Sequence, residues 1–226
     1  MKKILVVLTN TTHYENYNEA TGLWLGEATE FVEEVLKAGY TVDYVSPKGG
    51  FVPLDPRSMK YANDSDFSIY DSEDFRKRAL SNSLNPNQIC SEEYKSIYYT
   101  GGHGVMWDFP KDENLQKIAM KIYNSGGYIA TVCHGIAGLL ELKDDSGNYL
   151  IKGKNITGFT TTEECLAGKK NKVPYFSEKV AQERGAYFNK KRAYSEFAIQ
   201  DGRIITGQNP FSVKAVANLL INAMNQ

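Results

Sequence analysis

The chain has 226 residues, of which 42% are hydrophobic and 23% are charged. This is the balance of an ordinary globular protein with a substantial core, and it excludes an intrinsically disordered chain. The formal net charge of −1 provides no long-range attraction to nucleic acid or to an anionic membrane, so we expect neither as a partner. One domain spanning residues 1–226 accounts for the length.

The first predicted element is a buried strand at residues 4–8, an apolar run that turns polar at Thr9. The run is too short for a signal sequence or a membrane-spanning helix, so we expect a cytoplasmic protein. The three cysteines, Cys90, Cys133 and Cys165, are an odd number without the spacing of a metal site. We therefore predict no disulfide framework, no metal and no cofactor, and we expect a functional cysteine to act through its thiolate.

Strand-like runs alternate with helical patterns along most of the chain. Residues 23–37 carry an apolar stripe with helical spacing, Gly39 ends that helix, and residues 41–45 predict the second strand. The later predicted elements are strands at 97–100, 128–132 and 156–159, helices at 112–123, 177–184 and 211–224, a short helix from Cys133, and a hairpin formed by 197–199 and 203–206. This alternation predicts an α/β fold with a mainly parallel sheet sandwiched by helices.

The segment at residues 47–93 departs from this rhythm because it is polar and contains no clear strand. Its apolar side chains, Phe67, Ile69, Tyr70 and Phe75, indicate that it packs against the rest of the domain. We predict a cap-like excursion of short helices over one edge of the sheet. A disordered insertion is the alternative, although long loops in compact domains usually serve a function.

The strongest chemical signal is Cys133, which follows the apolar strand at 128–132 and precedes Gly135. A strand that ends abruptly at a nucleophile and turns tightly into a helix is typical of a nucleophile elbow. The helix N-terminus would favour an anion there and lower the pKa of the thiol. An inert buried cysteine is the alternative interpretation. The sequence context favours a reactive Cys133.

Four further residues are candidates for a catalytic role beside Cys133: His134, Glu163, Glu164 and Glu27. His134 would act as a base if the turn directs both side chains into one cleft. Glu163 and Glu164 are candidates for orienting that histidine, and a pair of solvated acids at a helix start is the simpler reading of them. Glu27 lies at the margin of the apolar stripe of the 23–37 helix. It is either an exposed acid or a buried, protonated donor to the Cys133 thiolate.

The Gly101-Gly102-His103-Gly104 turn follows the predicted strand at 97–100. Glycines at this position let backbone N–H groups approach a ligand oxygen, as an oxyanion hole requires. His103 either lines the pocket or caps the turn. Trp107 either forms an apolar wall of that pocket or belongs to ordinary packing.

Several stretches in order along the chain carry a resemblance to a known family: TGLWLGE at 21–27, AGY at 38–40, SPKGG at 46–50, GGHG at 101–104, WDFP at 107–110, VCHG at 132–135, GKNITGFT at 153–160 and GQNPFS at 207–212. With these motifs the chain resembles the ThiJ/PfpI superfamily, whose fold is that of the class I glutamine amidotransferases and is flavodoxin-like. Within it, the chain is similar to the branch of heat-shock chaperones and glutathione-independent glyoxalases. The resemblance covers almost the whole chain.

The resemblance implies a role for each matching residue. Cys133 corresponds to the nucleophile, His134 to its partner histidine, and Glu27 to the carboxyl group that hydrogen-bonds the thiolate. Glu164 corresponds to the acid that orients the histidine, with Glu163 as a weaker candidate. The family's oxyanion-binding amides correspond to Gly102 and the backbone of His134. A histidine/glutamate metal site of some relatives has no counterpart that can be placed from the sequence.

The resemblance also implies an activity, a glyoxalase III-type lyase (D-lactate dehydratase) that converts methylglyoxal or glyoxal without glutathione and serves a protective stress role. A homodimer is expected because family members are often dimers. A fold hosts many chemistries, so a cysteine peptidase or amidase is a second hypothesis. A stress chaperone or redox sensor without turnover is a third, from a different class of function.

Overall fold

The computed structural model describes residues 3–226 and contains a six-stranded sheet in the order β2-β1-β3-β4-β8-β7. All neighbours in this sheet are parallel except β7, which pairs antiparallel with β8. The strands are β1 (Lys3–Val7), β2 (Thr41–Val45), β3 (Ser96–Tyr99), β4 (Tyr128–Val132), β7 (Ala198–Asp201) and β8 (Ile204–Gly207). The prediction of a mainly parallel sheet between helices is confirmed.

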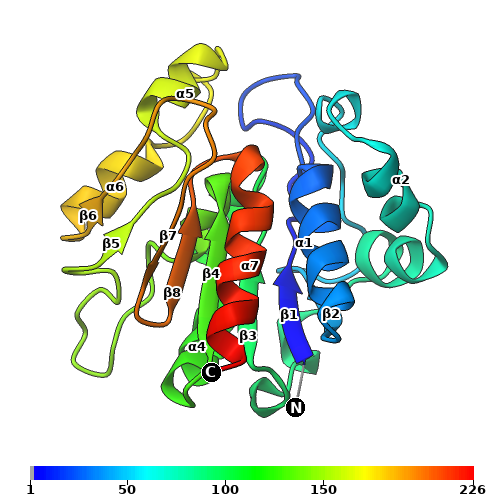
Figure 1. The fold of residues 1–226 in the computed structure, drawn as a ribbon. Helices are drawn as coiled ribbons and strands as arrows, with labels where there is room; N and C mark the ends of the chain where they lie inside the picture. The colour runs from blue at the N-terminus through cyan, green and yellow to red at the C-terminus, as the bar shows by residue number, and fades with distance from the viewer. Residues whose placement is uncertain (1–2) are drawn as a thin grey trace.

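Helices cover both faces of this sheet (Figure 1). Side chains alternate between the faces along β1: Ile4 and Val6 pack into the core beneath α1 (Leu25–Lys37) and α7 (Val213–Met224), whereas Leu5 and Val7 pack into the core beneath α4 (Glu113–Asn124). Because both faces are covered, the central strands are almost continuously apolar. In the described chain, no helix is long and apolar enough to cross a membrane.

The excursion at 47–93 is folded and lies beside α1 and the edge strand β2 (Figure 1). Its main helix, α2 (Asp64–Tyr70), begins at a capping box in which Asn63 and Asp66 satisfy each other's backbone N–H groups. The remaining turns are 3₁₀ helices at Ser58–Lys60, Pro86–Gln88 and Ser91–Glu93, and a π-helical stretch at Phe75–Ser81. Phe75 is buried in the core shared with α1, which is why the segment packs against the domain.

The structure differs from the sequence prediction after β4. The expected strand at 156–159 shrinks to β5 (Asn155–Ile156), which pairs with β6 (Tyr187–Phe188) in a separate two-stranded sheet. The ladder stops because the N–H of Thr157 donates to the Thr206 hydroxyl and the N–H of Phe159 donates to the Cys133 carbonyl. The chain is completed by the helices α3 (Val105–Asp108), α5 (Thr161–Leu166) and α6 (Ser177–Glu183) and by 3₁₀ turns at Phe109–Lys111 and Pro210–Ser212. Of these helices the sequence predicts α6, and it indicates α5 only as a helix start at Glu163 and Glu164.

The turn after β4 is a 3₁₀ helix at Cys133–Gly138 that lies against the end of β3. Gly135 sits there because a Cβ atom at this position would lie 2.3 Å from the Tyr99 carbonyl oxygen and 2.8 Å from that of Thr100. Backbone atoms of a central strand cannot move aside without breaking the sheet. The close approach of this turn to the sheet therefore requires glycine.

We expect Gly135→Ala to lower the free energy of unfolding by about 3 kcal/mol or more, because the methyl group overpacks against backbone. A matched control is Gly26→Ala in the first turn of α1, where the new Cβ would meet atoms no closer than 3.7 Å. That change should stabilise the protein by roughly 0.5–1 kcal/mol through helix propensity. Urea unfolding of the two variants measures both effects, and equal stabilities would contradict the packing explanation.

Candidate active site

The predicted site residues gather at the carboxyl edge of the sheet, where β3 and β4 end and α1 begins. A cavity of about 830 Å³ opens there, and Cys133, His134, Glu27, Gly102 and His103 are among the residues that line it. In an open parallel sheet, this edge is where ligands bind, because strand ends and helix starts converge on it.

Cys133 is a non-glycine residue with a positive φ, 56°, at the point where β4 turns into the 3₁₀ helix. This left-handed conformation is costly for an L-residue with a side chain and is typical of functional sites. The side chain is 3% exposed, and its Sγ lies 3.4 Å from Nδ1 of His134. The turn therefore directs the thiol and the imidazole of two adjacent residues toward each other.

Glu27 lies beneath the thiol and is fully buried on the first turn of α1. A Cβ on Gly101 would be 2.3 Å from Oε2 of Glu27, so the carboxyl group presses directly on that glycine. Burial raises the pKa of Glu27 to about 8, with a partial offset from the Cys133 thiol and the Gly101 backbone N–H. Neither oxygen completes a well-formed hydrogen bond with the described residues. At neutral pH the group is therefore mainly protonated and has an O–H to donate.

The expected lowering of the Cys133 pKa by a helix N-terminus is wrong. Burial raises the pKa of the Cys133 thiol, a charge on Glu27 would raise it further, and the backbone N–H of His134 only partly offsets them. The 3₁₀ helix that begins at Cys133 has only six residues, so its dipole is small. The raised pKa favours the thiol over the thiolate at Cys133.

The acid that contacts His134 is Glu164, which projects from α5. Nε2 of His134 lies 2.8 Å from Oε2 of Glu164, and Nε2 of His103 lies 2.7 Å from the other oxygen, Oε1. Burial would raise the pKa of Glu164, but the two imidazoles outweigh it and hold that pKa well below the usual range. An ionised carboxylate can only accept hydrogen bonds, so both Nε2 atoms carry the proton.

Glu163 is turned away from His134 and organises the surrounding loops. It closes the α5 capping box with Thr160, and its Oε1 accepts from the Tyr194 N–H and from the amides of Gln208 and Asn209. The reading of Glu163 and Glu164 as solvated acids is wrong, since both are buried in the first turn of α5. Their different partners follow from helical geometry, because adjacent helix residues point in directions about 100° apart.

The glycine turn after β3 lies at the edge of the cavity. Gly102 lines the cavity with a φ of 96°, and Gly101 lies below it against Glu27. His103 lines the cavity and does not merely cap a turn. Trp107, one alternative for which was a wall of the pocket, is not among the described residues that line the cavity. Its ring packs edge-on against Tyr14, and its Nε1–H donates to Glu15.

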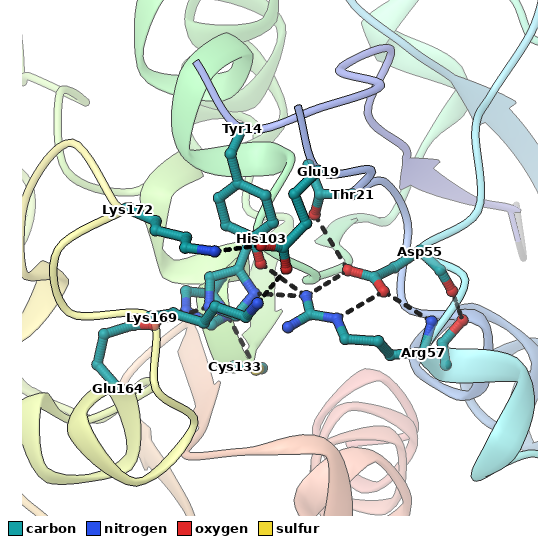
Figure 2. Close-up of polar contacts among 12 residues, drawn as sticks. Tyr14, Glu19, Thr21, Asp55, Arg57, His103, Cys133, Glu164, Lys169 and Lys172 are labelled. Carbon is teal, nitrogen blue, oxygen red and sulfur yellow. Dashed lines mark hydrogen bonds and ion pairs between the residues drawn. The ribbon is translucent and has the colours of Figure 1, made fainter. Parts of the chain in front are cut away.

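The cavity is also lined by residues that the sequence analysis did not identify. The mouth of the cavity carries exposed apolar side chains from four parts of the chain: Tyr61, Leu166, Tyr194 and Phe211. Arg57 enters from the 47–93 excursion, and its Nη2 lies 3.2 Å from Nδ1 of His103 (Figure 2). No sequence motif marked Arg57, because its importance comes from a contact across 46 positions.

His103, His134 and Glu164 each present a metal-ligand atom, and these atoms lie within 4.8 Å of one another. A cation among them would have to displace the Nε2 protons that both imidazoles direct at the carboxylate. It would also lie close to the positive guanidinium of Arg57. The arrangement fits a hydrogen-bonded cluster better than a metal centre, and the absence of a metal stays a prediction.

Comparison with known proteins gives consistent matches over the whole chain. Residues 2–223 match the profile of the DJ-1/PfpI family. The chain is 36% identical to "Glutathione-independent glyoxalase HSP31" of Saccharomyces cerevisiae, over 99% of this chain and 98% of that protein. It is similar in structure to REP24 of Francisella tularensis, with a TM-score of 0.96, 33% identity and 99% of each chain covered. Glyoxalase III of Candida albicans aligns with a TM-score of 0.87 and 32% identity, covering 98% of this chain and 96% of that one.

The buried acid beneath the thiol leads to a prediction about pH. The pKa of Glu27 is about 8 in the native state against an ordinary value of 4.5, so between these pH values the native state binds a proton that the unfolded state has released. The stability contributed by this proton is fully present below about pH 4.5 and is lost as the pH rises toward 8. The slope is roughly 1.4 kcal/mol per pH unit at most.

Glu27→Gln should remove this slope, because an amide does not titrate. We therefore expect the free energy of unfolding of the wild type, relative to Glu27→Gln, to fall steadily from acid to mildly alkaline pH in urea titrations. A difference between the two proteins that is constant with pH, or that grows as the pH rises, would show that Glu27 is ionised in the native state.

Proposed function

The chain belongs to the DJ-1/PfpI family, and on that premise we propose that it is a glutathione-independent glyoxalase that converts methylglyoxal to lactate. One observation carries the proposal: the buried Cys133 thiol lies between the protonated carboxyl group of Glu27 and the imidazole of His134. The ionised carboxylate of Glu164 orients that imidazole. The relatives named glyoxalase share nearly the full length of the chain. The catalytic roles given below to the site residues are part of this proposal.

The first step is the addition of Cys133 to the aldehyde. Nδ1 of His134 is the unprotonated ring nitrogen, because Nε2–H is donated to Glu164, so Nδ1 takes the proton from the thiol. The sulfur then adds to the aldehyde carbon, and the resulting oxyanion takes the proton back from Nδ1 of His134 to give a hemithioacetal, which leaves His134 neutral. Backbone N–H groups at Gly102 and His134 serve as the oxyanion donors.

The second step moves one proton between adjacent carbons. His134 removes the hydrogen from the hemithioacetal carbon to give an enediol, and a proton returned to the neighbouring carbon produces a lactoyl thioester of Cys133. Water then cleaves the thioester and regenerates the thiol. Methylglyoxal plus water gives lactate, one carbon being oxidised as its neighbour is reduced, so the reaction requires no external oxidant, reductant or cofactor.

A stress chaperone function is a second candidate, supported by the exposed apolar mouth of the cavity. Tyr61, Leu166 and Phe211 are 71%, 65% and 58% exposed, and they lie together at one opening. Clustered apolar surface of this kind is typical of binding sites for other chains. Such binding would not need the thiol, which distinguishes it from both glyoxalase and peptidase chemistry.

The proposal extends to assembly and location. We propose a homodimer in the cytoplasm, with the protein acting against toxic aldehydes under stress. The three cysteines are free in the structure, which suits a reducing compartment. Size-exclusion chromatography with light scattering separates a monomer of 25.3 kDa from a dimer.

Replacing the nucleophile tests the glyoxalase directly. We expect Cys133→Ala to lower lactate formation from methylglyoxal at least about 10³-fold, because no other group replaces the covalent step. Cys90→Ala is the matched control, since Cys90 is exposed and outside the site, and it should retain full activity. Circular dichroism verifies that both variants are folded. Wild-type protein that forms no lactate, or Cys133→Ala that still does, would overturn the proposal; peptide cleavage that depends on Cys133 would then favour the peptidase.

The chaperone candidate makes a separate prediction. Suppression of aggregation of a heat-denatured client should survive Cys133→Ala and should fall in a Leu166→Ser/Phe211→Ser variant, which removes apolar surface from the mouth. The measurement is light scattering of the client at fixed protein ratio. Equal protection by the wild type and by the mouth variant would exclude this surface as the client site.

A further inference from the structure

A chain of hydrogen bonds leaves the site on the side of His103 away from Glu164, and nothing in the proposed reaction uses it. Arg57 directs Nη2 at Nδ1 of His103, at 3.2 Å, and at the Tyr14 hydroxyl, at 2.7 Å (Figure 2). The same guanidinium forms a two-pronged ion pair with Asp55, Nε with one oxygen and Nη2 with the other. The two hydrogens of Nη2 are therefore shared among three acceptors, of which Nδ1 of His103 is the most distant. The guanidinium is thereby held at the back of the histidine.

The chemistry of arginine favours the same tautomer of His103 that the ionised Glu164 requires. A guanidinium has only donors, so Nδ1 of His103 must be the acceptor and cannot carry a proton. The single proton of the neutral ring is therefore on Nε2, which lies 2.7 Å from Oε1 of Glu164. Arg57 thus reinforces, from the opposite side of the ring, the tautomer in which His103 donates to Glu164.

The effect continues to the nucleophile. Oε1 of Glu164 accepts from His103, and Oε2 accepts from the Nε2–H of His134 at 2.8 Å. That contact leaves Nδ1 of His134 as the lone-pair atom 3.4 Å from Sγ of Cys133. Two imidazoles and one carboxylate therefore have their protons and their orientation set by a cation that enters from the 47–93 excursion.

We propose that Arg57 and His103 are positioning residues: Arg57 keeps His103 neutral and protonated on Nε2, and His103 holds Glu164 where it orients His134 toward Cys133. This proposal rests on the glyoxalase function proposed above. It assigns to the excursion a part in the reaction, because Arg57 belongs to that segment.

The guanidinium of Arg57 is held in place by buried partners. Asp55 is fully buried and also accepts from the Thr21 hydroxyl at 3.1 Å and from the Arg57 backbone N–H at 2.9 Å. Tyr14, the other partner of the guanidinium, lies in a loop fastened by Glu19, which pairs with Lys169 and Lys172 (Figure 2). An arginine held by a buried bidentate carboxylate loses little further entropy when it donates to His103.

The charges around His103 support a neutral ring. The titratable and charged groups that face it or act on it come from four parts of the chain: Tyr14, Arg57 with its partner Asp55, Cys133 with His134, and Glu164. Burial lowers the pKa of His103, the neighbouring His134 and Arg57 lower it further, and Glu164 offsets them in part, so that it falls to about 4. Without Arg57 the ring would gain a second proton at higher pH, pair with Glu164 as a cation, and oppose the positive charge that forms on His134.

The tautomer can be observed directly, whatever the activity. The chain has three histidines, so ¹⁵N-labelled imidazole NMR gives three resolvable spin systems, which His13→Gln and His103→Gln assign. We expect His103 in the wild type to be neutral and protonated on Nε2 at neutral pH. A His103 protonated on Nδ1, or doubly protonated, would overturn the proposal even if the protein is a fully active glyoxalase.

Substitution of Arg57 tests the functional part. We expect Arg57→Met to raise the pH at which His103 titrates, to lower kcat for methylglyoxal about tenfold with KM nearly unchanged, and to move the acid limb of the kcat profile toward neutral pH. Arg57→Lys keeps a cationic donor and should restore part of kcat. Arg76→Met, an exposed arginine of the same excursion outside the cavity, is the matched control and should match the wild type.

Each result of these experiments decides for or against the positioning role. A higher KM with unchanged kcat would make Arg57 a substrate-binding residue and overturn the proposal, as would a lower kcat without any movement of the His103 titration or the pH profile. If Arg57→Met fails to fold, the wild-type tautomer and the Arg57→Lys pH profile still decide. A wild type that shows the expected tautomer but forms no lactate would refute the glyoxalase and leave the assignment of the hydrogen-bond chain intact.

Discussion

Cys133 adopts a left-handed backbone conformation, with a φ of 56°, and the whole site depends on that turn. The conformation is unfavourable for a cysteine, so the surroundings have to hold it. Gly135 allows the turn to lie against the carbonyl oxygens of Tyr99 and Thr100, and the Cys133 carbonyl accepts from the N–H of Phe159. These contacts raise the thiol above the end of β4, over Glu27 and beside His134.

Two buried carboxyl groups near this thiol are held in opposite protonation states. Burial without a strong partner raises the pKa of Glu27 to about 8, whereas two imidazole donors keep Glu164 ionised. Environments that separate two acids in this way are typical of acid–base catalysis. In the proposed reaction, Glu27 offers a proton to the sulfur, and Glu164 stabilises the positive charge that His134 acquires when it takes the thiol proton.

The 47–93 excursion connects to this chemistry through Arg57. Segments of this kind often roof a site, but here the contact is more specific: a guanidinium fixed by Asp55 donates to His103, which donates to Glu164. The excursion also contributes Tyr61 to the apolar mouth of the cavity. The cavity of about 830 Å³ is larger than the three-carbon aldehyde of the proposed reaction.

The sequence by itself determined the alternation of strands and helices, the elbow at Cys133, and the acids from which the site is built. Those features are local, since an apolar run, a glycine stop or a nucleophile at a strand end is encoded within a few residues. It could not separate Glu163 from Glu164, place Trp107 outside the cavity, or identify Arg57. These outcomes depend on contacts such as that between His103 and Glu164, which are 61 positions apart. They also depend on the depth of burial, which decides whether each acid is protonated. Only the packing of distant segments sets those distances, which is why only the tertiary structure decided them.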